Sequence, residues 1–234
     1  KGKLRSRPQN TDYYFRESVG WTLLSSSYFG VRYNPCGSIF DVNGMSCFTD
    51  TPMTVLGLMI SNMCTEFLRV INPTLAFQVG DIQKIPFLDS LSSLPTNQIA
   101  DTIKLGVNDW DSYETSWDFQ QLPLLGVRCQ GLGVGECYAK MREQWIEDTL
   151  KMQELEEENN RIFIEAYGLQ DEIKPEVPLK EITLTCNPFY RYGVNPEVLG
   201  VRGEVLGVRE FPINEELEKR LLADTMKELI SYAV

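Results

Sequence analysis

The chain contains no histidine, and this absence removes several kinds of chemistry at once. Imidazole is the commonest general base near neutral pH and a frequent zinc ligand. The six cysteines do not compensate, because no two of them form a C-x-x-C pair. We therefore expect no metal site and no histidine-dependent catalytic centre. Scattered thiols in a chain of 234 residues, long enough to bury a core without disulfides, favour a reducing, cytoplasmic location.

The sequence also lacks a run of about 18 apolar residues, so it predicts no membrane-spanning helix and no membrane partner. It has no initiator Met, and no hydrophobic stretch follows the basic residues 1–7, as a signal peptide would require. The last residues, 227–234, end within a helical pattern. We expect the chain to be a piece of a longer protein.

The net charge of −11 is spread unevenly along the chain. Residues 1–100 carry eight Lys and Arg against seven Asp and Glu, whereas residues 101–170 carry six against fourteen and residues 171–234 eight against twelve. Neutralisation of phosphates dominates affinity for nucleic acid, so only the first hundred residues favour DNA contact. Their basic cluster consists of Lys1, Lys3, Arg5, Arg7 and Arg16.

We predict an α+β fold: a twisted, mainly antiparallel β module at 1–90, then a mostly helical spacer region at 91–234 with a loop-rich insertion at 171–212. Aromatic and β-branched residues predict strands at 13–15, 19–24, 28–33, 38–42 and 44–48. Apolar residues three and four apart predict one long helix at 139–167, ended by Gly168. Its acidic run, 154–158, is interpreted as a solvated face. A closing helix at 213–230 has Asn214 as its cap, and the near-repeat of 197–203 in 204–210 predicts a small hairpin or a flexible loop.

Four carboxylates, Asp109, Asp111, Glu114 and Asp118, lie within ten positions. We interpret them as a structural segment, because paired catalytic carboxylates must face each other across a cleft. The neighbouring Trp110, Tyr113, Trp117 and Phe119 are expected to anchor the segment to a core.

Residues 72–87 predict a short strand, a turn capped by Asp81, one helical turn and an exit at Pro86. With Leu58–Asn62 upstream, the string Val79–Pro86 resembles the recognition module of type I restriction specificity subunits and of adenine methyltransferases. Longer strings resemble the PglX family of BREX-type phage-defence adenine methyltransferases; they lie at 3–22, 109–119, 156–164, 167–172 and 186–192. The resemblance implies N6-adenine methylation of DNA in bacteria, with S-adenosylmethionine held by a catalytic domain elsewhere in the same polypeptide.

Two short motifs imitate a catalytic site. Asn187–Tyr190 resembles the (D/N)-P-P-(Y/F) motif that receives a flipped base, and Gly131–Gly135 resembles a cofactor-binding glycine loop. A doubly wound sheet needs several crossovers of a dozen residues or more between them, and the long helix occupies most of that stretch. We interpret both motifs as coincidences, so no catalytic residue and no bound cofactor is assigned to this chain.

Our leading hypothesis is a non-catalytic target-recognition fragment that positions double-stranded DNA. Phosphate contacts are predicted for Lys1, Lys3, Arg5, Arg7 and Arg16, and base contacts for Tyr28, Arg32 and Tyr33, since arginine can bond guanine through two hydrogen bonds. A second hypothesis is a scaffold that docks other defence-system subunits. A third is a complete small methyltransferase.

Overall fold

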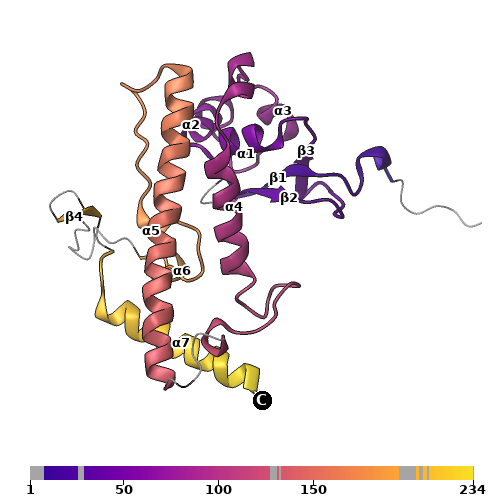
Figure 1. Ribbon diagram of the computed structural model, residues 1–234. Helices are drawn as coiled ribbons and strands as arrows, with labels where there is room; N and C mark the ends of the chain where they lie inside the picture. The colour runs from indigo at the N-terminus through magenta and orange to yellow at the C-terminus, as the bar shows by residue number, and fades with distance from the viewer. Residues whose placement is uncertain are drawn as a thin grey trace, which may run out of the picture. The chain divides into compact units, whose positions relative to one another are not determined.

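The computed structural model describes residues 8–25, 29–126, 131, 133–194, 204–205, 208–209 and 211–233 (Figure 1). The chain divides into two compact units. The sheet unit comprises Lys1–Ala100 and Asn159–Pro175, and the helical unit comprises Asp101–Glu158 and Glu176–Val234. A small antiparallel sheet together with helices confirms the predicted α+β class. The functional division at residue 90 stays a prediction.

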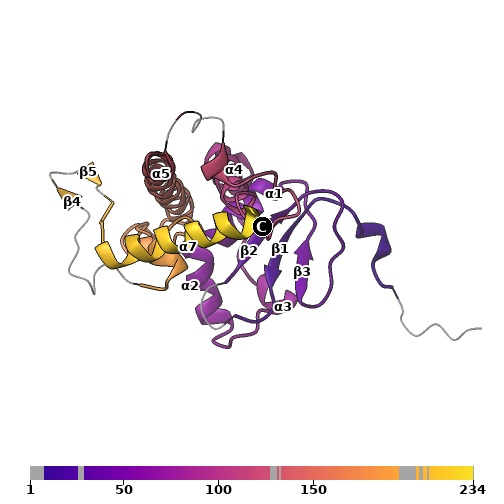
Figure 2. The same cartoon turned by 90° about the horizontal axis from the view of Figure 1, so that it is seen from below.

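The sheet has β1 (Ser18–Thr22) between β2 (Val31–Asn34) and β3 (Gly44–Cys47), with both pairings antiparallel (Figure 2). Because side chains alternate along a strand, one face of the sheet carries the buried Val19 and Trp21. The indole Nε1 of Trp21 donates to the carbonyl oxygen of Phe77 at 3.1 Å. The face with Val19 and Trp21 therefore packs against the rest of the sheet unit. The residues that alternate with them along the strand lie on the opposite face of the sheet.

The strands expected at 13–15 and 38–42 are wrong, and those expected at 19–24, 28–33 and 44–48 are found with shifted bounds as β1, β2 and β3. Residues Thr11–Tyr13 form a 3-10 turn (η1), and Phe15 has φ 65, which no strand residue adopts. The carboxylate of Asp41 accepts the N–H groups of Asn43 and Gly44, each at 2.9 Å, and so closes a turn before β3. Local turn chemistry overrides β propensity at both places.

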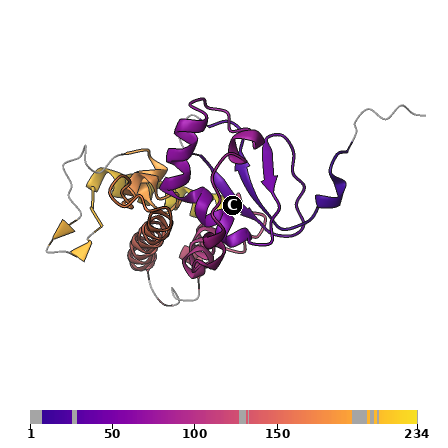
Figure 3. The ribbon, with the colours of Figure 1, turned by 90° about the horizontal axis from the view of Figure 1, so that it is seen from above.

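Residues 52–71 form two helices, α1 (Pro52–Ile60) and α2 (Asn62–Ile71), which are bent by 70° at Ser61. Figure 3 views the pair from above. In the part of the chain that the structure describes, no single helix is long and apolar enough to cross a membrane; only this bent pair together reaches that length and composition. Leu58 of α1 and Met63 of α2 belong to a buried cluster with Leu91, Phe163 and Ile164.

Residues 72–87 differ in detail from the expected strand and cap. The strand reduces to one bridge between Ala76 and Leu24, followed by the short helix α3 (Val79–Ile82). Asp81 is the third residue of α3 rather than its cap, and its carboxylate reaches back to the N–H of Gln78 at 3.1 Å. It also accepts from Asn72 Nδ2 at 2.6 Å, and these hydrogen bonds, led by that of Asn72, hold the pKa of Asp81 below its usual value. The 3-10 turn η2 (Asp89–Ser93) follows.

Two helices cross the boundary between the units along the chain: α4 (Asn97–Trp110) begins in the sheet unit, and α5 (Val134–Tyr167) ends there. The predicted stop of α5 is confirmed, because Gly168 has φ 70, a left-handed conformation that favours glycine. The remaining elements are η3 (Pro123–Leu125), η5 (Leu179–Glu181), α6 (Pro188–Arg191), β4 (Glu204–Val205), β5 (Val208–Arg209) and α7 (Glu215–Ala233).

The cap of the closing helix and the hairpin at the duplication agree with the predictions from the sequence. The Asn214 side chain caps α7 by accepting the N–H groups of Glu216 and Leu217 at 3.1 and 3.0 Å, as predicted. Strands β4 and β5 pair antiparallel within the second copy of the duplication, which is the hairpin alternative. The first copy, 197–203, lies outside the described residues.

The acidic run of α5 is only in part the solvated face that its composition predicts, because Glu154 and Glu158 are exposed whereas Glu156 and Glu157 are not. Glu157 is buried, and its carboxylate accepts the N–H of Val177 at 3.1 Å. Gln153, one turn earlier, donates to the carbonyl oxygen of Val177 at 2.6 Å, so the chain near Val177 runs along α5. Loss of hydration, reinforced by Glu181 and Glu157, raises the pKa of the half-buried Glu156 to about 8. The periodicity of a helix shows which residues share a face, but it does not show which distant segment packs on that face. The burial of Glu157 under the segment near Val177 could therefore not be predicted.

The segment at 109–118 has the structural role that was predicted for it, though with different anchors. Asp109 accepts the N–H groups of Thr185 and Cys186 at 2.6 and 2.9 Å. The expected anchoring by Trp110 and Trp117 is wrong, because their exposed fractions are 55% and 101%. Nothing in their spacing distinguishes these two rings from the half-buried Tyr113 and Phe119.

Candidate nucleic-acid interface

The face of the sheet opposite Val19 and Trp21 carries small and polar residues. In register, Gly20 of β1 lies between Arg32 of β2 and Ser46 of β3, and Ser18 lies beside Asn34. Alternation along the three strands brings these residues to one face, since residues two positions apart in a strand point the same way. The sheet thus has one face of apolar side chains and one of small and polar side chains, and on the second face Ser18 and Gly20 are themselves buried.

A hollow with a volume of about 170 Å³ lies over this polar face. Gly20 leaves space at its floor: a Cβ on Gly20 would lie 2.5 Å from Nδ2 of Asn34, which is closer than real atoms approach. The Asn34 side chain crosses that space, where its Nδ2 donates to Ser18 Oγ at 3.3 Å. A side chain on Gly20 would displace Asn34 and reshape the hollow.

An aromatic group supports one side of the hollow, and Arg16 rests on it. The Arg16 guanidinium carbon lies 5.2 Å from the ring centroid of Tyr13 and 6.0 Å from that of Phe48. The Phe48 ring centroid is 4.9 Å from that of Tyr13 and 5.2 Å from that of Phe40. Such cation–π contacts contribute roughly 0.5–1 kcal/mol at exposed sites, which orients the guanidinium without neutralising its charge.

Arg32 lines the same hollow from β2. Its Nη2 donates to Thr22 Oγ1 at 2.9 Å, and in the described part of the chain this partner is a hydroxyl rather than a carboxylate. Both Arg16 and Arg32 are exposed. Their positive charge is therefore available to an anion or to a base edge that enters the hollow.

The structure brings together two of the eight residues predicted to contact DNA, Arg16 and Arg32. Tyr33 follows Arg32 in β2 and so points to the other side of the sheet, where its hydroxyl donates to Glu17 Oε1 at 2.7 Å. That bond and burial raise the pKa of Tyr33 to about 12. A DNA contact by Tyr33 stays a prediction, and its hydroxyl would first have to leave Glu17. Lys1, Lys3, Arg5, Arg7 and Tyr28 lie outside the described residues.

Sequence reasoning missed Ser18, Asn34 and Ser46, which line the hollow beside the two arginines. The alternation of side chains along β1 is the sequence signal that could have identified Ser18. Once Val19 is assigned to the buried face, Ser18 and Gly20 belong to the other face. The pairing of β1 with β2 and β3 could not be read from the sequence, and without it these residues have no common location.

Asn187 of the methyltransferase-like motif is fully buried and caps α6. Its Oδ1 accepts the N–H of Phe189 at 3.2 Å, and its Nδ2 donates to the carbonyl oxygens of Leu179 and Ile182 at 2.7 and 2.9 Å. The amide protons are thus committed to the protein's own backbone. The named strands of the described residues are all antiparallel, so they do not form the parallel sheet that a catalytic interpretation requires.

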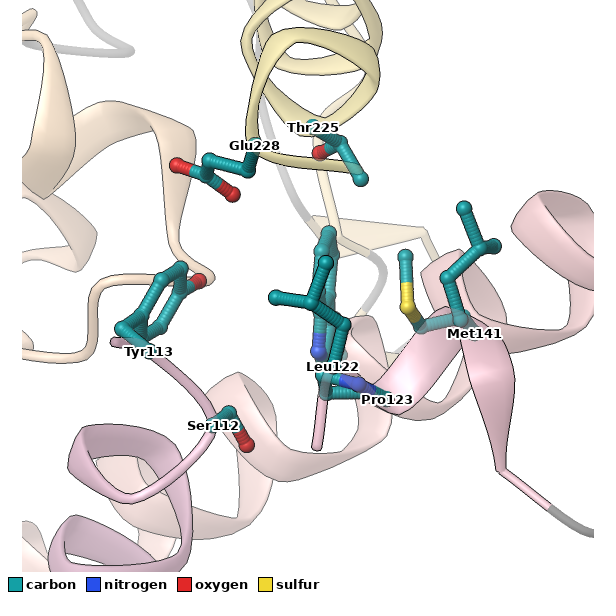
Figure 4. A pocket seen from close by; sticks show the side chains of 9 residues that line it. Ser112, Tyr113, Leu122, Pro123, Met141, Thr225 and Glu228 are labelled. Carbon is teal, nitrogen blue, oxygen red and sulfur yellow. The ribbon is translucent and has the colours of Figure 1, made fainter. Parts of the chain in front are cut away.

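A cavity in the helical unit is too small for a substrate. It has a volume of about 10 Å³, the space of one water molecule. Figure 4 shows Tyr113 on one side of it and Met141 on the other, with Leu122 between them in this view. Burial raises the pKa of the Tyr113 phenol well above its usual value, and the phenol finds no hydrogen-bond partner among the described residues. This position is suited to an ordered water rather than to a ligand.

The strings that carry the resemblance meet one another in space. In the sheet unit, Asn159 donates to Gly57 and Asn160 accepts from the N–H of Asn62 at 2.9 Å, while the Tyr167 hydroxyl donates to the carbonyl oxygen of Pro86. In the helical unit, Asp109 holds the backbone just before Asn187. These strings therefore maintain the scaffold of each unit.

No family model matches the chain. Over 189 residues, 78% of the chain, it is 32% identical to the adenine-specific methyltransferase PglX of Lacticaseibacillus casei (strain Zhang). Over an alignment of 241 residues, 99% of the chain, it is 28% identical to the adenine-specific methyltransferase BrxX of Escherichia coli O9:H4 (strain HS). The chain spans only 16% and 18% of the length of these two proteins. Its homologues are thus adenine-specific methyltransferases, PglX and BrxX, and it corresponds to a minor part of each.

Proposed function

We propose that this chain is the DNA target-recognition part of a bacterial N6-adenine-specific DNA methyltransferase of a phage-defence system. In this proposal it positions double-stranded DNA, and a catalytic domain elsewhere in the same polypeptide binds S-adenosylmethionine and transfers the methyl group. The observation that carries the proposal is the polar sheet face, where Arg16 and Arg32 line one hollow.

The charge and chemistry of that face support contact with DNA. Arginine is the residue best suited to bond phosphate or guanine through two parallel hydrogen bonds. The sheet unit also draws most of its residues from the near-neutral first hundred, whereas the rest of the chain is strongly acidic. An acidic surface repels the DNA backbone, so the sheet unit is the favoured part for an encounter.

The test is the salt dependence of binding to duplex DNA, measured by fluorescence anisotropy with the whole chain. A recognition part should lose affinity steeply as salt increases, because each contacted phosphate releases counterions. The double variant Arg16→Ala/Arg32→Ala should bind more weakly and reduce the slope of log K against log salt by about two if both arginines contact phosphates.

Arg69→Ala is the matched control. Arg69 lies in α2 of the same unit, is 69% exposed and forms an ion pair with Glu66. The Arg69→Ala variant removes the same kind of charge from the same unit, at a position remote in sequence from the sheet face. It should therefore leave the slope of log K against log salt unchanged. A loss in Arg69→Ala half as large as that in the double variant would show that only net charge matters, because Arg69→Ala removes one charge and the double variant removes two.

A protein-interaction scaffold is the second candidate, and the exposed tryptophans of the helical unit favour it. Trp117 is fully exposed, and large aromatic side chains are enriched at protein interfaces. A scaffold should bind no duplex DNA at either low or high salt. In that case, pull-down of other defence subunits should be lost in Trp117→Ser, while Arg16→Ala/Arg32→Ala leaves it intact.

A further inference from the structure

The hollow on the polar face of the sheet is concave, and its concave shape limits how it could contact DNA. The inference drawn from this shape rests on the proposed function. In a duplex, base edges lie at the floor of a groove about 8.5 Å deep, so helices, ribbons and protruding side chains reach them. A concave surface cannot descend into that groove. A hollow receives a base only when the base has left the stack, as in single-stranded segments or after extrusion.

The hollow is of a size that suits a single base. Its volume is about 170 Å³, compared with about 10 Å³ for the one-water cavity of the helical unit. Sites for drug-sized ligands are larger, at roughly 300–1,000 Å³. The hollow therefore has room for one small planar group and not for a nucleotide chain.

The lining offers both kinds of contact that an unstacked base needs. Phe40 and Phe48 provide apolar rings, and the Arg16 guanidinium rests on Phe48 with a planar face of its own. Ser18, Asn34 and Ser46 bring hydroxyl and amide groups that both donate and accept hydrogen bonds. A phosphate would use donors only and would gain nothing from the rings. Bases, by contrast, stack on aromatic and guanidinium planes and form hydrogen bonds at their edges.

We propose that the hollow over the polar face of β1, β2 and β3 holds a single unstacked DNA base, with Arg16 and Phe48 at its side and Asn34 and Ser46 at its edge. The base would come from a distorted or locally opened duplex. The exposed Arg32, which also lines the hollow, would contact the adjoining backbone.

The experiment compares two probes: a fully paired duplex, and the same duplex with a short unpaired bubble at its centre. Ser46→Leu fills the hollow without changing any charge, and Ser46→Ala leaves it open and is the control. Because stacking of one base contributes substantially to such complexes, we expect Ser46→Leu to weaken binding of the bubble about tenfold. Its affinity for the paired duplex should change less than about twofold. Ser46→Ala keeps the hollow open and removes only one edge hydroxyl, so it should weaken binding of the bubble by no more than about threefold and leave the paired duplex unchanged.

Equal effects of Ser46→Leu on the two probes, or no effect on either, would overturn the inference and leave the proposed function standing. Failure of the wild-type chain to bind either probe would instead overturn the proposed function. Should Ser46→Leu not fold, as judged by circular dichroism, Asn34→Leu removes the polar edge at nearly constant volume. It should show the same selective loss on the bubble, and an unchanged affinity for the bubble would count against the inference.

Discussion

The side-chain amide of Asn159 donates to the carbonyl oxygen of Gly57 at 2.8 Å, across 102 residues of sequence. Gly57 lies in the last turn of α1, where carbonyl groups have no partner within the helix. Both groups are buried, so the bond satisfies an acceptor that water cannot reach. Asn160, the next residue, accepts the first N–H of α2, and the two asparagines together stabilise the bend at Ser61.

Gly57→Ala should destabilise the sheet unit, because α5 lies too close for a side chain. A Cβ on Gly57 would lie 2.9 Å from Phe163 Cε2, 3.0 Å from Asn159 Oδ1 and 3.1 Å from Ile99 Cδ1. Crowding of this kind costs about 1–3 kcal/mol. Urea unfolding followed by circular dichroism measures the loss.

Gly106→Ala is the control with the opposite sign. Gly106 lies within α4, and nothing lies within 4 Å of a Cβ built there. Alanine in a helix interior is more favourable than glycine by about 0.5–1 kcal/mol, so this variant should be more stable than wild type. A Gly57→Ala variant as stable as wild type would mean that α1 is not packed so closely.

Asn187→Asp should destabilise the helical unit rather than alter any catalytic property. Aspartate occupies this position in many amino-methyltransferase motifs, so a catalytic role would tolerate the change. In this structure the substituted carboxylate could not donate to the carbonyl oxygens of Leu179 and Ile182, and its buried charge would face both of them. Loss of two buried hydrogen bonds should cost about 3 kcal/mol in thermal or urea unfolding. Unchanged stability would contradict the structural role of Asn187.

Local signals in the sequence predict the parts of this fold that depend on near neighbours. Gly168 and Asn214 are found at the ends of helices where their backbone and capping preferences place them. The bend at Ser61 is different: Ser61 caps α2 locally by accepting the N–H of Cys64, but the bend is also held by Asn159 and Asn160, about a hundred residues away. The hollow depends likewise on the pairing of β1 with β2 and β3. Charge predicts Arg16 as a contact residue, and charge together with its place in the β-rich region predicts Arg32, but their common location depends on the strand register.

Glu156→Gln should change how stability depends on pH. The pKa of Glu156 rises from 4.5 to about 8, mainly through loss of hydration. A carboxyl that holds its proton more tightly in the folded state stabilises the fold at low pH, and this stabilisation is lost as pH rises from about 4.5 to 8. Glutamine resembles the protonated form, so the variant should match wild type near pH 4, below the pKa of the unfolded chain. Near pH 8.5 it should be more stable by about 2 kcal/mol, allowing for partial exposure of the side chain.

Glu165→Gln, an exposed position on the same helix, is the control for Glu156→Gln. It removes the same charge from α5 without removing a buried carboxylate, so its unfolding free energy should follow that of wild type at every pH. Urea unfolding at a series of pH values compares the three proteins. Parallel pH profiles for wild type and Glu156→Gln would show that Glu156 ionises normally in the folded chain.

The ion pair of Arg142 and Glu218, 76 residues apart, should contribute far more to stability than the exposed ion pair of Lys219 in α7. Arg142 Nε and Nη2 donate to the two carboxylate oxygens at 2.8 and 2.7 Å, and the side chains are only 8% and 22% exposed. Arg142→Met would leave the Glu218 carboxylate half-buried without its partner, at a cost of about 3–5 kcal/mol. Adding Glu218→Leu should recover part of that loss, because the double variant has no unpaired charge.

The control for this pair is Lys219, which lies next to Glu218 in α7 and is 3.6 Å from Glu215, with both side chains largely exposed. Exposed pairs contribute about 0–1 kcal/mol, so Lys219→Ala should be nearly neutral. Urea unfolding of the Arg142→Met, Glu218→Leu and double variants gives the coupling free energy between the two residues. A coupling below about 0.5 kcal/mol would mean that Arg142 acts mainly through its contact with the Phe211 ring, whose centroid lies 5.0 Å from the guanidinium carbon.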